Sequence, residues 1–122
     1  MQDKTLRLYA IVRGDLEMPP GKLASQAGHA FLESYLNSFP PTQEEYRLDG
    51  VGTKITLRAR HLDDILKAQF LCQQECLSHA IIVDEGHVMP PHFDGSPIIT
   101  AIGIGPYRRD EISHITDTFK LV

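Results

Sequence analysis

Tryptophan is absent from this chain of 122 residues, and cysteine occurs only twice. The two cysteines, Cys72 and Cys76, lie four positions apart, a spacing that fits neither a Cys-x-x-Cys redox or zinc pair nor a disulfide framework. Internal repeats and low-complexity tracts are missing too. We therefore expect two reduced thiols that serve as packing residues.

Long hydrophobic runs are also missing. No apolar stretch approaches the roughly 18 residues that are needed to span a bilayer. The start of the chain, Met1-Gln2-Asp3-Lys4, is polar and lacks the order of a secretory signal, in which an apolar stretch follows a charged flank. These absences predict a cytoplasmic protein with no membrane partner.

Positive charge is in deficit, since twelve Lys and Arg residues face sixteen Asp and Glu residues, for a net charge of −4. This balance argues against capture of nucleic acid or anionic membrane by bulk charge, so such a partner would have to meet a local basic patch. Surface solubility explains the same basic residues without any partner. The residues that such a patch would draw on are Arg13, Lys22, Lys54, Arg58, Arg60, Arg108 and Arg109.

What the chain does contain is enough apolar material for one folded unit. With 42% hydrophobic residues, residues 1–122 are expected to form a single domain. The hydrophobic patterns predict strands at 6–12, 53–59, 80–83 and 98–104 and helices at 22–36, 63 or 64 to 76, and 110–116. This order predicts an α/β fold, in which one sheet has helices on both faces.

The remaining segments are expected as connections. Residues 37–52 hold at most one short helix, and 85–97 form a loop rich in Pro and Gly. Gly105-Pro106 is expected to end the last strand, and residues 119–122 to add an edge contact. The continuous apolar run at 80–83 predicts a strand that is covered on both faces.

The helix predicted at 22–36 carries the first candidate site. Ala24, Ala27, Phe31 and Tyr35 fall on one face, as core packing requires. Lys22, Gln26 and His29 fall within roughly 60° of one another on the opposite side. They offer a cation, an amide that donates and accepts hydrogen bonds, and a general acid or base. The alternative is an ordinary solvated helix face.

Two aspartates follow predicted strands directly and form the second candidate. Asp15 comes after the first strand and Asp84 after the run at 80–83. Sites in open α/β sheets gather beyond the carboxyl ends of strands, so parallel neighbouring strands would bring both aspartates and the start of the Lys22 helix to one rim. The alternative is that each carboxylate caps a local turn.

Two other motifs are rejected. Gly103-Ile104-Gly105 lacks the third glycine of a dinucleotide-binding loop. His87 and His92 share a loop with acidic residues, but their spacing matches no recognised set of metal ligands. The sequence therefore predicts no metal and no cofactor.

The order of residues resembles the type 2 peptidyl-tRNA hydrolases of archaea and eukaryotes. Arg13 to Met18 and Gly21 to Ala30 are similar to the opening signature of that family. Four further blocks, at 54–57, 81–86, 100–106 and 117–122, follow in the same order as in the family. The resemblance therefore covers nearly the whole chain.

The resemblance implies a three-layer fold with a mixed four-stranded sheet, and a homodimer. It also implies hydrolysis of the ester that joins a peptide to the 3′ end of tRNA, without metal or cofactor, so peptidyl-tRNA is the expected partner. Carried over by position, Lys22 and Asp84 are the expected catalytic residues. The residues expected to bind substrate or support the site are Gln26, His29, Arg13, Asp15 and Thr100.

One position departs from the family pattern. After Asp84, the family usually has a threonine where this chain has Val88, whose side chain neither donates nor accepts a hydrogen bond. Ser96 and His87 are the candidates to take its place. The alternative to hydrolysis is a weakened or inactive relative that acts as a tRNA-binding or protein-binding module.

Overall fold

A computed structural model describes residues 3–48 and 50–122 of the chain. Residues 1 and 2 of the predicted polar start, and residue 49 of the predicted connection, lie outside the described residues. The helices and strands follow one another in the order β1 (Leu6–Arg13), α1 (Pro20–Asn37), α2 (Pro40–Arg47), β2 (Thr53–Ala59), α3 (Leu62–Gln74), β3 (His79–Asp84), β4 (Val88–Met89), β5 (Phe93–Asp94), β6 (Ile98–Arg108), α4 (Arg109–Thr116) and β7 (Lys120–Leu121).

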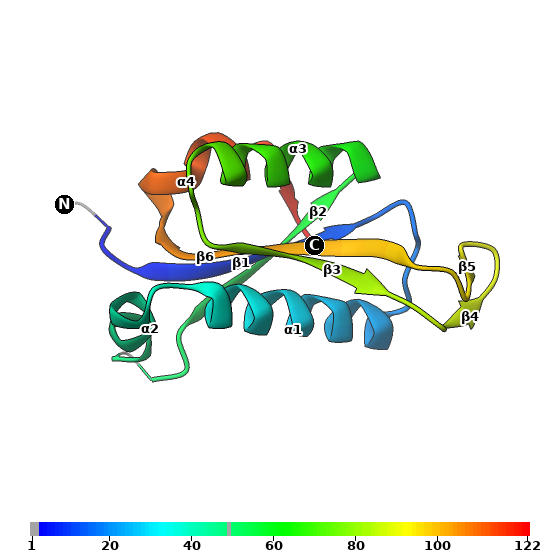
Figure 1. Cartoon of the computed structure of the whole chain (residues 1–122), viewed down its shortest axis with the longest axis horizontal. Coiled ribbons are helices and arrows are strands. Elements are labelled where there is room, and N and C mark those ends of the chain that lie inside the picture. The colour runs from blue at the N-terminus through cyan, green and yellow to red at the C-terminus, as the bar shows by residue number, and fades with distance from the viewer. Residues whose placement is uncertain (1–2, 49) are drawn as a thin grey trace.

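Five of the described strands form one mixed sheet in the order β3-β6-β1-β2-β7. β1 and β2 are parallel, whereas β6 runs antiparallel to both β1 and β3. β1, β2 and β3 therefore point the same way, and their carboxyl ends lie along one edge. Helices α1 and α2 cover one face and α3 and α4 the other, so the predicted three-layer α/β fold is confirmed (Figure 1). Within the described ranges, no helix is both long and apolar enough to cross a bilayer.

The predicted number of four strands is wrong, because the sheet has five. The additional strand is β7, which pairs antiparallel with β2 through Leu57–Leu121 and Arg58–Lys120. The tail was expected to make only an edge contact, since two residues are too few to show the alternation of a strand. A separate pair, β4 and β5, forms a hairpin inside the segment that was expected to be a loop.

The prediction that the strand at 80–83 is covered on both faces is wrong. Strand β3 lies at the edge of the sheet. Val83 is 52% exposed, whereas Ile82 is buried on the α1 side. The interior position beside β1 belongs to β6. A run of β-branched residues favours a strand but does not decide its place in the sheet.

Strand β6 also continues past the point where it was expected to end. Gly105 adopts a φ of 110°, which favours glycine, and the pairing with β1 shifts register there before it resumes at Arg7–Tyr107. Gly105-Pro106 therefore forms a β-bulge and does not end the strand.

The two cysteines differ in their surroundings. Both are free, as predicted, but only Cys72 is a packing residue; its burial raises the pKa of the thiol to about 12. Cys76 is exposed and has a φ of 54° just beyond α3, which ends at Gln74. The left-handed backbone explains why the helix is shorter than its sequence pattern indicated.

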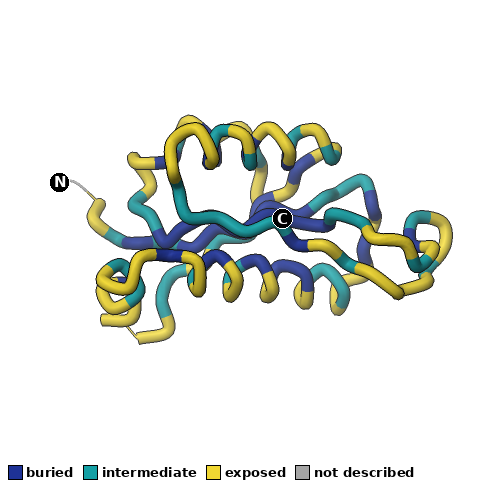
Figure 2. The backbone as a smooth tube through the Cα atoms, viewed as in Figure 1, coloured by how far each residue is buried: buried dark blue, intermediate teal, exposed yellow. Residues whose placement is uncertain are grey.

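Helix α1 packs on the sheet through small residues. Ala27, Ala30 and Ser34 are buried against it, and the Ser34 hydroxyl donates to the Gly105 carbonyl over 2.7 Å. The buried face of α1 is therefore rotated relative to the predicted apolar face, because Ala24 is exposed and Gln26 is buried. Figure 2 shows the buried positions of α1 along its side nearest the sheet. Close approach of the helix backbone favours small side chains over large ones at the contact.

Gly103 marks the point of closest approach. A Cβ atom added there would lie 2.0 Å from the Ala30 carbonyl oxygen, which is backbone and cannot turn aside. We expect Gly103→Ala to lower the free energy of unfolding by about 3 kcal/mol, measured by urea denaturation. Gly28→Ala on α1 is the control, because a Cβ atom added at Gly28 would meet no atom within 4 Å. A Gly103→Ala protein as stable as the control would contradict this packing.

Candidate active site

An ion pair joins the start of α1 to the end of β3. Lys22 Nζ lies 3.0 Å from Asp84 Oδ2, although the two residues are 62 positions apart in sequence. The side chains are only 11% and 17% exposed, so the charges meet at a partly desolvated position. The sequence hypothesis required these two groups to meet, and they do.

The hairpin of β4 and β5 supplies two further contacts to the lysine. The Lys22 amine lies 2.6 Å from His87 Nδ1 and stands over the Phe93 ring, 4.3 Å from its centroid. Phe93 is buried in the cluster that includes Met18. Sequence reasoning missed Phe93; the signal was Val88-Met89 before Pro90-Pro91 and Phe93 shortly after it, a pattern that allows a short hairpin.

Gln26 and Thr100 form a buried hydrogen bond between α1 and β6. The Thr100 hydroxyl donates to Gln26 Oε1 over 2.6 Å, and both residues are buried. A solvated face is therefore wrong for Lys22 and Gln26, whose side chains turn toward the end of the sheet. The bond fixes the Gln26 amide one helical turn from Lys22.

Arg13 and Asp15 form a second ion pair at the end of β1. The guanidinium donates to both carboxylate oxygens, over 3.1 and 2.7 Å, and to the Ile99 carbonyl over 3.0 Å. The hydrogen bonds from Arg13 hold the pKa of Asp15 below its usual value. The Asp15 carboxylate thus binds an arginine side chain rather than serving mainly as a turn cap.

The two pairs lie on one rim of the sheet. β1 and β3 are parallel, as the hypothesis assumed, but they are not neighbours, since β6 runs between them. The start of β6 connects the pairs, because Arg13 binds the Ile99 carbonyl while Asp84 lies opposite Ile98. The shared rim therefore depends on β6.

His29 is exposed and makes no hydrogen bond to any described residue. It lines a groove along β3 together with Glu33 and Asn37. His29 shares an angular position with Lys22, but seven residues of helix separate them by about 10 Å along the axis. The structure therefore does not bring His29 to the ion pair.

Comparison with known proteins decides the family. The family model described as Peptidyl-tRNA hydrolase PTH2 matches residues 6–122. This chain belongs to that family. It is similar to proteins named peptidyl-tRNA hydrolase from Methanothermobacter thermautotrophicus, at 32% identity over 96% of this chain and all of the relative. The protein of the same name from Staphylothermus marinus is 34% identical over 92% of this chain and 91% of the relative.

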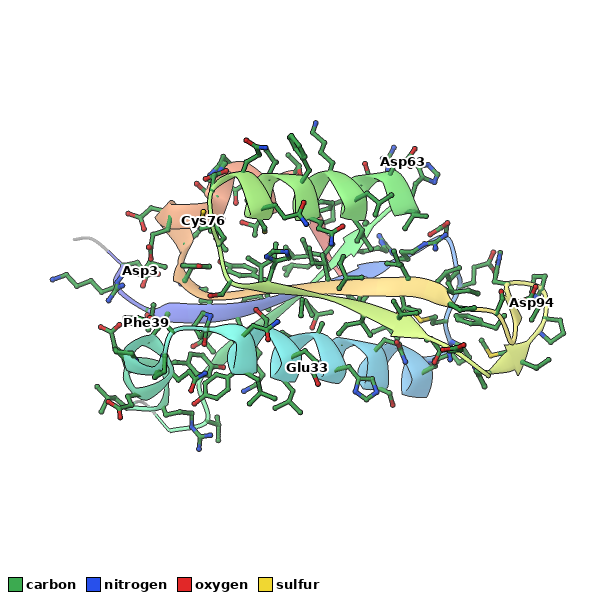
Figure 3. The ribbon with its side chains drawn as sticks, viewed as in Figure 1. Asp3, Glu33, Phe39, Asp63, Cys76 and Asp94 are labelled. Atoms are coloured by element: carbon green, nitrogen blue, oxygen red, sulfur yellow. The ribbon has the colours of Figure 1, made fainter. Side chains whose placement is uncertain are left out.

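Ser96 and His87 are the two residues that the resemblance offered in place of a threonine at position 88, and their contacts differ. Val88 itself is 67% exposed. The Ser96 hydroxyl donates to Asp94 Oδ1 over 2.5 Å, and hydrogen bonds from Ser96 lower the pKa of that carboxyl group. Figure 3 shows Asp94 at the hairpin end of this family member. Of the two candidates, only His87 contacts Lys22.

The loop histidines were rejected as metal ligands. Over residues 3–48 and 50–122, no group of three or more His, Cys, Asp or Glu side chains is arranged to hold a metal ion. His92 lies 3.9 Å from a Glu17 oxygen.

The Arg13–Asp15 pair predicts a pH dependence of stability in this peptidyl-tRNA hydrolase family member. A carboxyl group with a lowered folded-state pKa stabilises the fold above its unfolded value of 3.8, and this contribution is lost as the pH falls. We expect Asp15→Asn to cost roughly 1 kcal/mol near pH 7. In urea denaturation, the difference from wild type should shrink as the pH falls below 3.8. A difference that does not vary with pH would contradict the ion pair.

Proposed function

We propose that this chain hydrolyses the ester between peptide and tRNA in peptidyl-tRNA, with Lys22 and Asp84 as its catalytic residues. The 3.0 Å contact between Lys22 Nζ and Asp84 Oδ2 carries the proposal. It joins a cation to a carboxylate at a rim where a ligand can approach the ends of strands. The relatives named above bear the name of this enzyme, which favours hydrolysis over a binding module.

The two groups divide the chemistry between them. The Asp84 carboxylate takes a proton from water while the water oxygen attacks the ester carbonyl carbon. Lysine has three N–H donors; Asp84 and His87 take two, and the third is directed at the oxygen on which negative charge develops. Collapse of the tetrahedral intermediate breaks the bond to the ribose 3′ oxygen, which leaves with a proton. The products are the peptide acid and tRNA.

The predicted substrate-binding residues support this centre in different ways. The bond from Thr100 orients Gln26 beside Lys22, so that its amide meets the peptide or the terminal ribose. Arg13 and Asp15 hold the adjoining turn in place. His29 lines the groove along β3 and contacts a more distant part of the substrate there.

His87 takes over the position of the missing family threonine. Its Nδ1 atom accepts a hydrogen bond from the Lys22 amine, and its ring packs on Phe93 with a centroid distance of 5.8 Å. The histidine thereby directs the amine toward the substrate. Val88 is then free of any catalytic role.

This proposal extends to the setting of the reaction. The chain acts as one peptidyl-tRNA hydrolase domain over residues 1–122, in the cytoplasm, where peptidyl-tRNA arises. A homodimer remains a prediction, which sedimentation equilibrium would test.

Removal of either catalytic group is the first test. We expect Lys22→Ala and Asp84→Asn each to lower kcat for release of labelled peptide from peptidyl-tRNA by about 100-fold or more, because each removes a group that acts in the transition state. Lys54→Ala is the control, since this exposed lysine contacts, within residues 3–48 and 50–122, only the Val51 carbonyl and the Tyr46 ring. Unchanged turnover in both active-site variants would remove these roles. A wild-type protein that binds tRNA without turnover would instead support the binding module.

The role of His87 is tested separately. His87→Ala should lower kcat by about tenfold, because the lysine loses one of its two hydrogen-bond partners among the described residues. Ser96→Ala changes the same loop but leaves the amine untouched, and it should retain wild-type turnover. Equal effects of the two variants would show that His87 has no special part in the reaction.

A further inference from the structure

A second cavity lies on the face of the sheet opposite α1. It has a volume of about 710 Å³ and is enclosed by the end of β2, helices α3 and α4, and the C-terminal segment with β7. The Lys22–Asp84 pair lies on the α1 side and does not line this cavity. The residues that line it have no part in the chemistry described above.

Four basic residues line this cavity: Arg58, Arg60, Lys67 and Lys120. None of the four makes an ion pair or a side-chain hydrogen bond to any described residue. By contrast, five other basic residues each pair with a carboxylate, namely Arg7, Arg13, Lys22, Arg108 and Arg109. Among the described residues, four of the seven cations that pair with no carboxylate thus line this cavity, and the other three, Lys4, Arg47 and Lys54, lie outside it.

The other titratable residues of the cavity do not neutralise it. Asp64 is the one carboxylate among the described lining residues, and it accepts a hydrogen bond from the His61 backbone at the start of α3. His114 contacts Glu75 over 2.8 Å. A surplus of positive charge remains.

Two of the cations oppose each other directly. Arg58 of β2 and Lys120 of β7 are register partners in adjacent antiparallel strands. Like charges at such positions destabilise a sheet. This unfavourable like-charge pair has no compensating contact to any described residue, which points to a function. An anion bound between the two side chains would remove the repulsion.

The cavity adjoins the rim of the proposed active site. Gly14 lines it and lies between Arg13 and Asp15; a Cβ at Gly14 would come within 2.8 Å of the Arg58 side chain. Asp63 at the start of α3 and Asp94 in the hairpin lie at the same end of the molecule (Figure 3). A ligand chain in the cavity can therefore continue over the 13–15 turn toward Lys22.

We propose that this cavity binds backbone phosphates of the tRNA part of the substrate. The inference rests on the proposed function, because it assigns the second cavity to the same substrate. Several separated cations suit a chain of phosphates better than a single small anion. Phosphate contacts position a nucleic acid without reading its sequence, so the cavity would hold any tRNA while the ion pair acts on the ester.

The test compares two triple variants that remove equal charge. The cavity variant, Arg60→Gln/Lys67→Gln/Lys120→Gln, removes three of the four cations that line the cavity. The control variant, Lys4→Gln/Arg47→Gln/Lys54→Gln, removes three exposed cations outside it. Binding of fluorescently labelled, deacylated tRNA is measured by anisotropy as a function of salt. We expect the cavity variant to bind at least about tenfold more weakly and the salt slope to fall by about 2 to 3, with little change in the control.

A second readout separates the cavity from the chemistry. Turnover of a short ester, an N-acetylaminoacyl adenosine, should be the same in the cavity variant and in wild type. Wild-type tRNA affinity in the cavity variant, or an equal loss in both variants, would overturn the proposal. If the wild-type protein hydrolyses no ester, the proposed function is overturned. The phosphate-binding proposal is still tested in that case, because the anisotropy measurement does not require turnover.

Discussion

The ion pair between Lys22 and Asp84 is the contact on which the rest of the site depends. Each charge would be costly to desolvate alone, so the pair is stable only while both groups are held together. Helix α1 places the amine, β3 places the carboxylate, and the 3.0 Å distance joins the two layers. His87 and Phe93 enclose the amine from the hairpin side.

Close packing of α1 on the sheet makes this geometry possible. The Ala30 backbone lies against Gly103 of β6, and the Ser34 hydroxyl binds the Gly105 carbonyl. Because small residues occupy the contact, the helix lies near the sheet, and its first turn meets the carboxyl edge where Asp84 ends its strand. On the opposite face, the same edge carries the unpaired cations of the second cavity. One edge thus carries both the proposed catalytic pair and the cavity proposed to bind phosphates.

Much of this arrangement could be predicted from the sequence. Alternation predicted the strand at 53–59, the apolar segment at 98–104 predicted another, and the family likeness indicated Lys22 and Asp84 as site residues. The sequence pattern could not predict the order of the strands in the sheet or how deeply each is buried. Nothing local to 80–83 distinguishes an edge strand from an interior one, and Lys120–Leu121 is too short to show alternation. The contact from His87 and the ring of Phe93 required the hairpin to fold back on α1. Likewise, the cluster around Arg58 joins residues from three separate elements, which only tertiary structure brings together.

A double-mutant cycle on the ion pair tests the central claim most directly. Single-turnover hydrolysis of peptidyl-tRNA would be measured for wild type, Lys22→Met, Asp84→Asn and the double variant. Residues that act as one unit are strongly non-additive, so the double variant should be no slower than the slower single variant. Losses that multiply, as for two independent residues, would contradict the account.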